Sequence, residues 1–351
     1  MKGTVLALGQ VAGRDLAALM VDGQLEELAL VPDLLSPGAI LRGRAGRPMK
    51  GMGGLFVELP DGARGFLRQT KGIAPGQSLL VQVAGAAEPG KAPPLSRKLS
   101  IRGRHAVLTP EAPGLNISRA IRDEAQREAL EGVAAQVMAG ADDALGLILR
   151  SACAEAAPQD IAEEAASLRA LAQAITADTD GPPELLLSAP DPRERAWRDW
   201  PLPDTVDDSQ GALDRHGVLA AIDALLRPDV ALPGGASMSI EPTRALVAVD
   251  VNTGPDTSPA AGLKACVAAA RDLPRQLRLR GLGGQVVIDL APCPKRERHI
   301  VEQVLRKGFR QEGGETVLAG WTPLGNFELQ RRRDRVPLAE WMQPAPEQAL
   351  P

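Results

Sequence analysis

Residues 244–254 read RALVAVDVNTG and residues 281–289 read GLGGQVVID, and these two stretches decide the fold of the last third of the chain. Each contains a continuous apolar run that leads into an aspartate, Asp250 in the first and Asp289 in the second. The residues between them predict a helix, with a kink or a new turn expected at Pro274. Strand, helix and strand in this order predict a parallel βαβ unit within an α/β sheet.

The two aspartates are candidate metal ligands. The C-terminal ends of neighbouring parallel strands open on one edge of a sheet, so we expect Asp250 and Asp289 side by side. Adjacent carboxylates repel unless a cation or a proton neutralises them, and Mg²⁺ prefers such oxygen ligands while it retains several waters. Asn252 can add an amide oxygen. A strand-end Asp can instead be a helix cap or a turn residue, and the strand pattern alone supports both interpretations about equally.

The composition is that of an ordinary globular chain. Its 351 residues are 44% hydrophobic and 24% charged, which allows two or three modules and a sizeable core. No apolar run reaches the length of a membrane span, and no apolar signal segment follows Met1. The three cysteines are far apart and form no CxxC pair, which argues against a disulfide framework or a cysteine-built zinc site. A reducing cytoplasm is the expected location.

Charge is distributed unevenly along the chain. The net charge is −4, yet residues 38–105 contain 12 Lys and Arg against 3 Asp and Glu, whereas residues 123–214 contain 6 against 20. A charge run is often only a solvated face, and that explanation is sufficient for the acidic block. The basic block is rich in Gly and poor in acids, which favours a nucleic-acid partner.

The rest of the chain divides into segments with different patterns. Residues 1–36 alternate apolar and polar positions around an Asp-Gly pair, which predicts a β-hairpin. Residues 37–100 contain four or five short strand-like runs separated by glycine turns, which predict a small closed barrel. Residues 101–181 combine strand-like pieces with two predicted helices. Residues 181–210 are rich in Pro and Asp and predict an irregular connection.

The ordered motifs of the last third resemble the catalytic segment of the ribonuclease E/G family. The matching runs are VDVNTG at 249–254, RQLRLRGLGG at 275–284 and VVID at 286–289. The resemblance extends from about residue 38 to residue 333. Further family-like runs are GLFVE at 54–58, GFL at 65–67, RHAVLTP at 104–110, ISR at 117–119 and LGNFEL at 324–329.

This resemblance, to a short form of the family, implies an α/β fold of several subdomains. An RNase H-like subdomain, split between residues 1–36 and 182–228, would carry an inserted S1 (OB-fold) β-barrel at 37–100 and a 5′-sensor region at 101–181. A DNase I-like α/β catalytic subdomain would follow at 229–345. The family's C-terminal cysteine pair, which shares zinc between protomers, has no counterpart in this sequence, so a zinc-linked dimer is not expected.

The resemblance also implies a catalytic centre and a 5′-end site. Asp250 and Asp289 match the family's metal aspartates, and Asn252 matches the asparagine beside them. This implies a Mg²⁺-dependent endoribonuclease that cleaves single-stranded RNA to 5′-phosphate and 3′-hydroxyl ends, in rRNA or tRNA processing or in mRNA decay. Arg150 and Ser151 match an Arg-Thr pair that recognises a 5′-monophosphate, and an arginine fork beside a hydroxyl suits a phosphate.

Four further residues match family contacts to RNA. Phe56 and Phe66 match aromatic residues on the barrel surface, where bases can stack. Both are alternatively candidates for the barrel core. Lys91 matches a lysine that contacts phosphate in the same module. Arg119 matches a basic residue on the RNA path, although an ordinary surface arginine is an equal alternative.

Two departures from the family pattern lie near the predicted metal ligands. Pro292 stands where members often carry another Asp, and residues 266–268 read CVA where members often read Asn-Leu-Glu. Both metal aspartates are present, so we expect activity, in a weaker form. One alternative is an RNA-binding family member that has lost catalysis, which would bind RNA in a salt-dependent way without cleaving it. Another is a metal-dependent phosphodiesterase with a different substrate, which competition between RNA and duplex DNA would distinguish.

Overall fold

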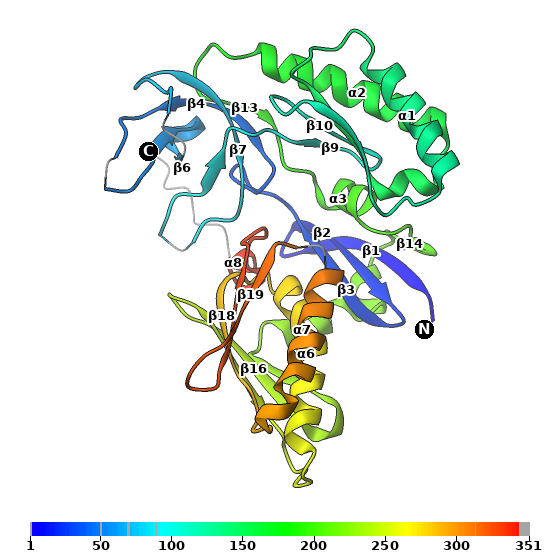
Figure 1. The fold of residues 1–351 in the computed structure, drawn as a ribbon, viewed down its shortest axis with the longest axis vertical. Coiled ribbons are helices and arrows are strands. Elements are labelled where there is room, and N and C mark those ends of the chain that lie inside the picture. Colours follow the sequence, from blue (N-terminus) through cyan, green and yellow to red (C-terminus); the bar gives the residue numbers. More distant parts are fainter. Residues whose placement is uncertain (1, 50, 69–70, 89, 313, 344–351) are drawn as a thin grey trace. The chain divides into compact units, whose positions relative to one another are not determined.

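The computed structural model of the chain consists of two compact units. Unit 1 comprises residues 1–31 and 203–351, and unit 2 comprises residues 32–202. The structure describes residues 2–49, 51–68, 71–88, 90–312 and 314–343. Within these ranges, no helix combines the length and the apolar character needed to cross a bilayer. Both units mix helices with sheets, which confirms the predicted α/β class (Figure 1).

Unit 1 is built around a six-stranded mixed sheet with the strand order β15-β16-β17-β18-β20-β19. The central strands β17 (Val247–Asn252) and β18 (Gly284–Asp289) are parallel and joined by α6 (Ala261–Leu279), so the predicted βαβ unit is confirmed. Every other pairing in this sheet is antiparallel. The flanking strands are β15 (Asp229–Ala231), β16 (Ser237–Pro242), β19 (Thr316–Trp321) and β20 (Phe327–Arg331).

Helices cover one face of this sheet. α6 and α7 (Arg298–Gln311) lie side by side against it (Figure 1), and their apolar residues share one buried core with alternate sheet residues. α6 is a single helix through Pro274, so the expectation of a new turn at that residue is wrong. Gly308 of α7 packs closely there, and a Cβ added to it would lie 3.0 Å from Cγ of Pro274. The absence of a side chain at Gly308 thus leaves room for the ring of Pro274, which lacks the N–H for the helical hydrogen bond.

The start of the chain forms a second, four-stranded sheet in unit 1. β1 (Thr4–Val11), β2 (Arg14–Val21) and β3 (Gln24–Leu30) form an antiparallel meander, and the predicted Asp-Gly turn joins β2 to β3. β14 (Thr205–Asp207) joins this sheet from far along the chain and runs parallel to β1. The short helices of this part are α4 (Ala212–Arg215), α5 (Val218–Leu225) and α8 (Leu338–Trp341), and all three contribute to its core.

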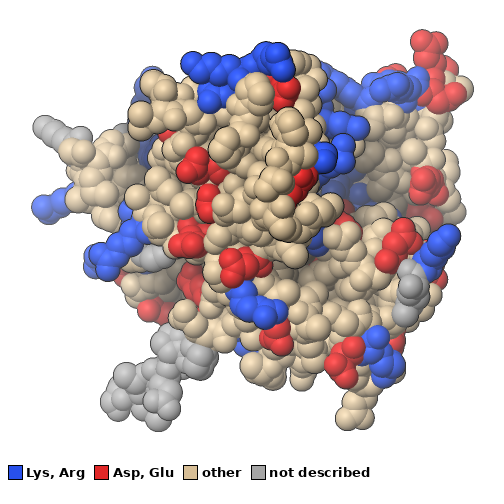
Figure 2. Space-filling view, turned by 90° about the horizontal axis from the view of Figure 1, so that it is seen from below, with Lys and Arg blue, Asp and Glu red and all other residues tan. Residues whose placement is uncertain are grey.

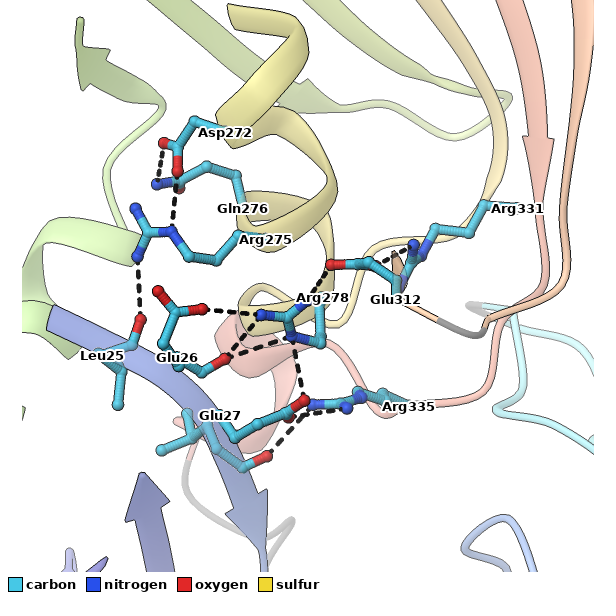
Figure 3. Close-up of polar contacts among 11 residues, drawn as sticks. Leu25, Glu26, Glu27, Asp272, Arg275, Gln276, Arg278, Glu312, Arg331 and Arg335 are labelled. Atoms are coloured by element: carbon cyan, nitrogen blue, oxygen red, sulfur yellow. Dashed lines mark hydrogen bonds and ion pairs between the residues drawn. The ribbon is translucent and has the colours of Figure 1, made fainter. Parts of the chain in front are cut away.

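A network of charged side chains fastens α6 to β3. Arg278 of α6 donates to the backbone oxygen of Glu26 and pairs with the carboxylates of Glu26, Glu27 and Glu312 (Figure 3). Arg331 of β20 binds the second carboxylate oxygen of Glu312 at 2.8 Å, and the side chains of Arg331 and Glu312 are each only 5% exposed. Burial raises the pKa of Glu312, and the charges of Arg278 and Arg331 oppose that rise.

Five strands of unit 2 form a closed barrel. They pair in the order β4-β5-β6-β8-β7, and β7 pairs again with β4. Alternate residues of these strands, among them Leu41, Val57 and Val81, point inward and form an apolar core. The predicted small barrel is therefore confirmed. Its strands are β4 (Ile40–Ala45), β5 (Leu55–Glu58), β6 (Arg64–Leu67), β7 (Ser78–Val83) and β8 (Pro94–Ser96).

The remainder of unit 2 contains a four-stranded sheet that packs against two long helices. Both helices lie within the segment for which the sequence predicts two helices. The strands are β9 (Ile101–Arg102), β10 (Ala106–Thr109), β11 (Gly114–Ile117) and β12 (Gly146–Leu149), and the helices are α1 (Glu124–Met138) and α2 (Pro158–Ala177).

The expectation of an irregular connection at residues 181–210 is wrong. This segment contains β13 (Glu184–Leu187), which pairs with β4, and the helix α3 (Pro192–Asp199), followed by β14. Asp191 caps α3 by accepting a hydrogen bond from the backbone N–H of Glu194 at 2.8 Å. An Asp followed by Pro at the first helical position is typical of a helix start, so Asp191 and Pro192 begin α3 and do not form a loop.

Candidate functional site

Asp250 and Asp289 occupy directly opposed positions on the two parallel strands. The register of β17 and β18 pairs the two residues, and neighbouring strands lie roughly 4.8 Å apart. Both aspartates are exposed, whereas Val249, Val251 and Ile288 beside them point into the core under α6 and α7. The expectation that the two aspartates lie side by side is confirmed. Alternation along the strands places both carboxylates on the sheet face opposite these helices.

Polar side chains from two strands surround Asp250. Asn252 lies two residues further along β17 on the same face, and its Nδ2 donates to Oδ2 of Asp250 at 2.7 Å. β16 places Ser239 opposite Asp250 and Ser237 opposite Asn252. The sequence reasoning missed both serines because it missed β16. The alternation Ser-Met-Ser-Ile at residues 237–240 is the signal that would have revealed them.

This donor set fits a hydrated divalent cation. Like charges directly opposite each other on neighbouring strands are unfavourable unless a cation compensates them. Among the described residues, no third His, Cys, Asp or Glu joins the pair to complete a metal-binding cluster. Two carboxylates with an amide nearby leave room for water, as Mg²⁺ requires. Glu328 of β20, opposite Val287, is a further acid on this face that the sequence reasoning missed.

The loop after β18 is held tightly against α6. Sγ of Cys266 donates to the carbonyl oxygen of Ala291 at 3.3 Å. A Cβ added to Gly262 would lie 1.8 Å from the carbonyl oxygen of Pro292, so only glycine fits there. Burial raises the pKa of the Cys266 thiol to about 12, and the neighbouring Cys293 adds to this rise. The thiol therefore remains protonated at neutral pH. The two departures from the family pattern, at 266–268 and at 292, therefore lie at one helix–loop contact.

Phe56 and Phe66 form a pair on the outside of the barrel. The two residues are opposite each other in β5 and β6, with ring centroids 5.4 Å apart in an edge-to-face arrangement. Both rings are half-buried, while their chain neighbours Leu55 and Leu67 belong to the barrel core. The alternative that the two phenylalanines form the barrel core is therefore wrong.

Lys91 and Arg119 are exposed basic residues in different parts of unit 2. Lys91 lies in the loop before β8, which runs beside the Phe66 strand. Its ammonium pairs with Glu88 at 2.7 Å, and its side chain is 67% exposed. Arg119 lies just after β11, in the four-stranded sheet. Only Lys91 therefore shares the barrel with the aromatic pair.

Arg150 is held by neighbouring protein groups at the end of β12. Its Nη1 donates to the carbonyl oxygens of Gly103 at 2.5 Å and Arg198 at 3.0 Å, and its Nη2 pairs with Asp199 at 3.1 Å. Burial alone would raise the pKa of Asp199, but Arg198 and Arg150 hold it below its usual value. Ser151 beside Arg150 is exposed. A phosphate at this position would meet the charge of Asp199, an acid that the sequence reasoning missed.

Figure 2 shows how charge is distributed over one face of the molecule. Lys and Arg side chains lie there in small groups, with Asp and Glu groups between them. No single sign of charge covers this face, so any phosphate contact on it would depend on a few local residues.

These features define a class of α/β protein that combines a small closed OB-like barrel, carrying surface aromatics, with a mixed sheet that presents two opposed aspartates. A sequence model of the Ribonuclease E/G family matches residues 100–208 and 202–334. The chain belongs to this family, and the predicted membership is confirmed.

Individual relatives agree with this assignment. Ribonuclease E of Nostoc sp. is 30% identical over 376 aligned residues, which cover 91% of this chain and 54% of that protein. Ribonuclease E of Synechocystis sp. is 29% identical, with 94% and 57% covered. Ribonuclease G of Salmonella typhimurium is 26% identical, with 85% and 73% covered. The chain thus spans about half the length of the first two relatives.

Proposed function

We propose that the chain is an endoribonuclease that holds Mg²⁺ between Asp250 and Asp289 and cleaves single-stranded RNA to 5′-phosphate and 3′-hydroxyl ends. The supporting observation is the direct opposition of these two exposed aspartates, in a chain whose relatives are named ribonuclease E and ribonuclease G. A bound divalent cation would polarise a phosphoryl oxygen and lower the pKa of a coordinated water. The RNA substrates would belong to rRNA or tRNA processing or to mRNA decay.

The chain's own residues contribute charge and orientation at this site. Asp250 and Asp289 supply two negative charges at a fixed spacing set by the sheet. Asn252 fixes the Asp250 carboxylate by donating to its Oδ2, so this side chain does not need to be ordered when substrate arrives. Ser239 offers a hydroxyl on the same face.

The finer architecture follows from the same proposal. We assign β1–β3 and β14 to an RNase H-like subdomain, the closed barrel to an S1 module and residues 101–181 to a 5′-sensor region. The six-stranded sheet with α6 and α7 is the proposed DNase I-like catalytic subdomain. The bounds at residues 36, 100, 181 and 228 remain those expected from the sequence.

Phe56 and Phe66 provide the proposed stacking surface for RNA bases. Replacing either with Ala is expected to weaken single-stranded RNA binding by about 1–3 kcal/mol, roughly 5- to 150-fold, because each ring can stack one base. Fluorescence anisotropy with a labelled oligonucleotide in EDTA measures this change without cleavage. Leu115→Ala is the matched control, since Leu115 is another exposed apolar residue of unit 2. Unchanged affinity in both Phe variants would exclude stacking at this pair.

Lys91 and Arg119 are the proposed phosphate contacts of this unit. A lysine that binds one phosphate releases about one counterion, so Lys91→Ala should reduce the salt dependence of binding by about one unit of slope. This loss would be uniform across RNA sequences, in contrast to the loss of a stacking residue.

Cleavage of a single-stranded, A/U-rich oligonucleotide tests the proposed function directly. We expect Mg²⁺-dependent cleavage that is faster for a 5′-monophosphorylated substrate than for a 5′-hydroxyl substrate. Arg150→Gln should remove this preference, because Arg150 and Ser151 are the proposed 5′-phosphate site. Asp199→Asn should strengthen it, since the Asp199 carboxylate now competes for the Arg150 guanidinium. End-group analysis of the products checks for 5′-phosphates.

The second candidate function is an RNA-binding family member with weakened or lost catalysis. The observation that favours it is the altered helix–loop contact between Cys266 and Ala291, immediately after the Asp289 strand. Salt-dependent RNA binding without cleavage under any divalent metal would support this function and contradict the first. Equal competition by duplex DNA would instead indicate a phosphodiesterase of broader substrate range.

A further inference from the structure

An open pocket of about 450 Å³ lies directly after the strand that carries Asp289. Its wall is the loop from Leu290 to Pro294, and it is completed by Arg298, Trp321 and Gly325. The volume is within the range of roughly 300–1,000 Å³ typical of small-molecule sites. β18 presents Asp289 on the sheet face, and the next residue already lines the pocket. The pocket and the proposed metal site are therefore built from one chain segment.

Arg298 gives this pocket a positive charge. The carbon at the centre of its guanidinium lies 4.4 Å from the ring centroid of Trp321, so the two planar groups are in contact. Its Nε is buried and has no hydrogen-bond partner among the described residues. This atom has almost no exposed surface, so the phosphate contact falls to the terminal nitrogens, of which Nη2 lies beside Gly325 of the pocket wall. The exposed Lys295 adds positive charge where the loop leads into α7, whereas Arg296 pairs with Glu297 at 3.7 Å.

Trp321 gives the pocket a rigid aromatic wall. Its ring packs edge-to-face against the buried Phe327, with centroids 5.3 Å apart, which limits its movement. Bases of single-stranded RNA stack on aromatic rings and on arginine guanidinium planes. Pro292 and Pro294 supply further apolar surface. The combination of a cation, an aromatic wall and apolar surface suits a nucleotide better than an inorganic anion or an apolar molecule.

We propose that this pocket binds one nucleotide of the RNA strand, with its phosphate at Arg298 and its base against the Arg298–Trp321 pair. This inference rests on the proposed function, because it takes the bound nucleotide to belong to the RNA strand that the two aspartates would cleave. Trp321 and Arg298 lie on the helix side of the sheet, so the strand would reach Asp289 around the C-terminal end of β18. Binding there fixes the position of the strand relative to the two aspartates.

Fluorine NMR of the whole chain labelled with 5-fluorotryptophan tests this site. The chain has four tryptophans, so four resonances are expected, and Trp321→Phe identifies one of them. Titration with uridine 5′-monophosphate in EDTA should shift the Trp321 resonance saturably and leave the other three in place. Arg298→Gln should weaken this binding by about tenfold or more, because it removes a charge-assisted phosphate contact. Lys307→Gln, which removes an exposed charge from the same helix, should leave it unchanged.

The outcomes separate this inference from the proposed activity. Binding of the nucleotide at Trp321 without any RNA cleavage would retain the pocket and reject the nuclease. Cleavage that depends on both aspartates, with no shift of the Trp321 resonance at millimolar nucleotide, would reject the pocket and retain the nuclease. An equal shift with inorganic phosphate would show a simple anion site and overturn the nucleotide assignment. In a cleaving enzyme, Arg298→Gln should raise KM for RNA while kcat changes little.

Discussion

Replacing either Asp250 or Asp289 with Asn is expected to lower the rate of RNA cleavage by about three orders of magnitude. Each substitution removes one of the two charges that would hold the cation, and metal stabilisation of a phosphoryl transition state contributes several kcal/mol. A loss of about 4 kcal/mol corresponds to roughly a thousandfold in rate. Single-turnover cleavage of a labelled single-stranded oligonucleotide in saturating Mg²⁺ measures this loss independently of product release.

The same two substitutions are expected to leave the fold at least as stable as before. Asp250 and Asp289 are directly opposite on neighbouring strands, so replacing one carboxylate removes a repulsion in the metal-free protein. The melting temperature in EDTA should therefore stay the same or rise. Mg²⁺ should raise the melting temperature of the parent protein but not of either variant, because a ligand stabilises only a state that binds it. Lost activity can thus be distinguished from lost structure.

Asp229→Asn is the matched control for this experiment. Asp229 of β15 is opposite Ser239, which is itself opposite Asp250, so all three residues lie in one row across the same face. Three strand spacings, about 14 Å, separate Asp229 from Asp289, too far for both to bind one ion. The control should cleave at close to the parent rate. Full cleavage by both Asp250→Asn and Asp289→Asn would reject the metal assignment.

The pairing of these two aspartates was predictable because it depends on local patterns. Two apolar runs joined by a helix can form few arrangements, and a parallel βαβ unit brings their ends together. The register that sets Asp250 against Asp289 agrees with this expectation. The apolar run predicted a strand that ends at Asp250, but β17 continues to Asn252. Because Val249 and Val251 point into the core, Asp250 between them lies on the exposed face of the sheet.

Features that depend on distant pairings were not predictable in this way. β20 pairs with β18 from about 40 residues further along the chain, so the sequence did not indicate that Glu328 lies on the face of the site. Ser239 differs, because β16 pairs with the adjacent strand β17 and its alternation was a local signal that the sequence analysis overlooked. α3 was missed for a different reason. Its Asp191-Pro192 start has the composition of a loop, and the meaning of that pair emerges only when a helix follows. The contact between Asp199 and Arg150 was not predicted either, because Asp199 is the last residue of α3.

Arg278→Met is expected to destabilise the folded protein by about 3–5 kcal/mol, because it removes one of the two arginines that compensate the buried Glu312 and also the ion pairs with Glu26 and Glu27. Arg278 and Arg331 both pair with Glu312 (Figure 3). The side chains of Arg278 and Glu312 are 13% and 5% exposed. Methionine preserves most of the side-chain volume, so the loss reports charge pairing and not a cavity. Urea denaturation followed by circular dichroism measures the change in the free energy of unfolding.

Arg306→Met is the control, because Arg306 pairs with Glu302 on the surface of α7, where its side chain is 55% exposed. Such a pair within one helix contributes about 0.3–0.5 kcal/mol, so this variant should unfold almost as the parent does. If Arg278→Met lowers the unfolding free energy by less than about 1 kcal/mol, the ion pairs of Arg278 contribute no more than surface pairs do, which would contradict the argument from burial.

The loss of unfolding free energy caused by Arg278→Met should also depend on pH. Burial already raises the pKa of Glu312 above its ordinary value of 4.5, and removing Arg278 takes away the first of the two charges that oppose this rise. A carboxyl whose pKa is higher in the folded state binds more protons when folded, so the folded state loses stability as pH rises between the unfolded and folded pKa values. The difference in unfolding free energy between the Arg278→Met variant and the parent should therefore become smaller as the pH falls toward 4.5 and larger toward neutral pH. A difference that is constant over this range would show that Arg278 stabilises β3 and α6 through its hydrogen bonds to the Glu26 backbone, and not through its charge.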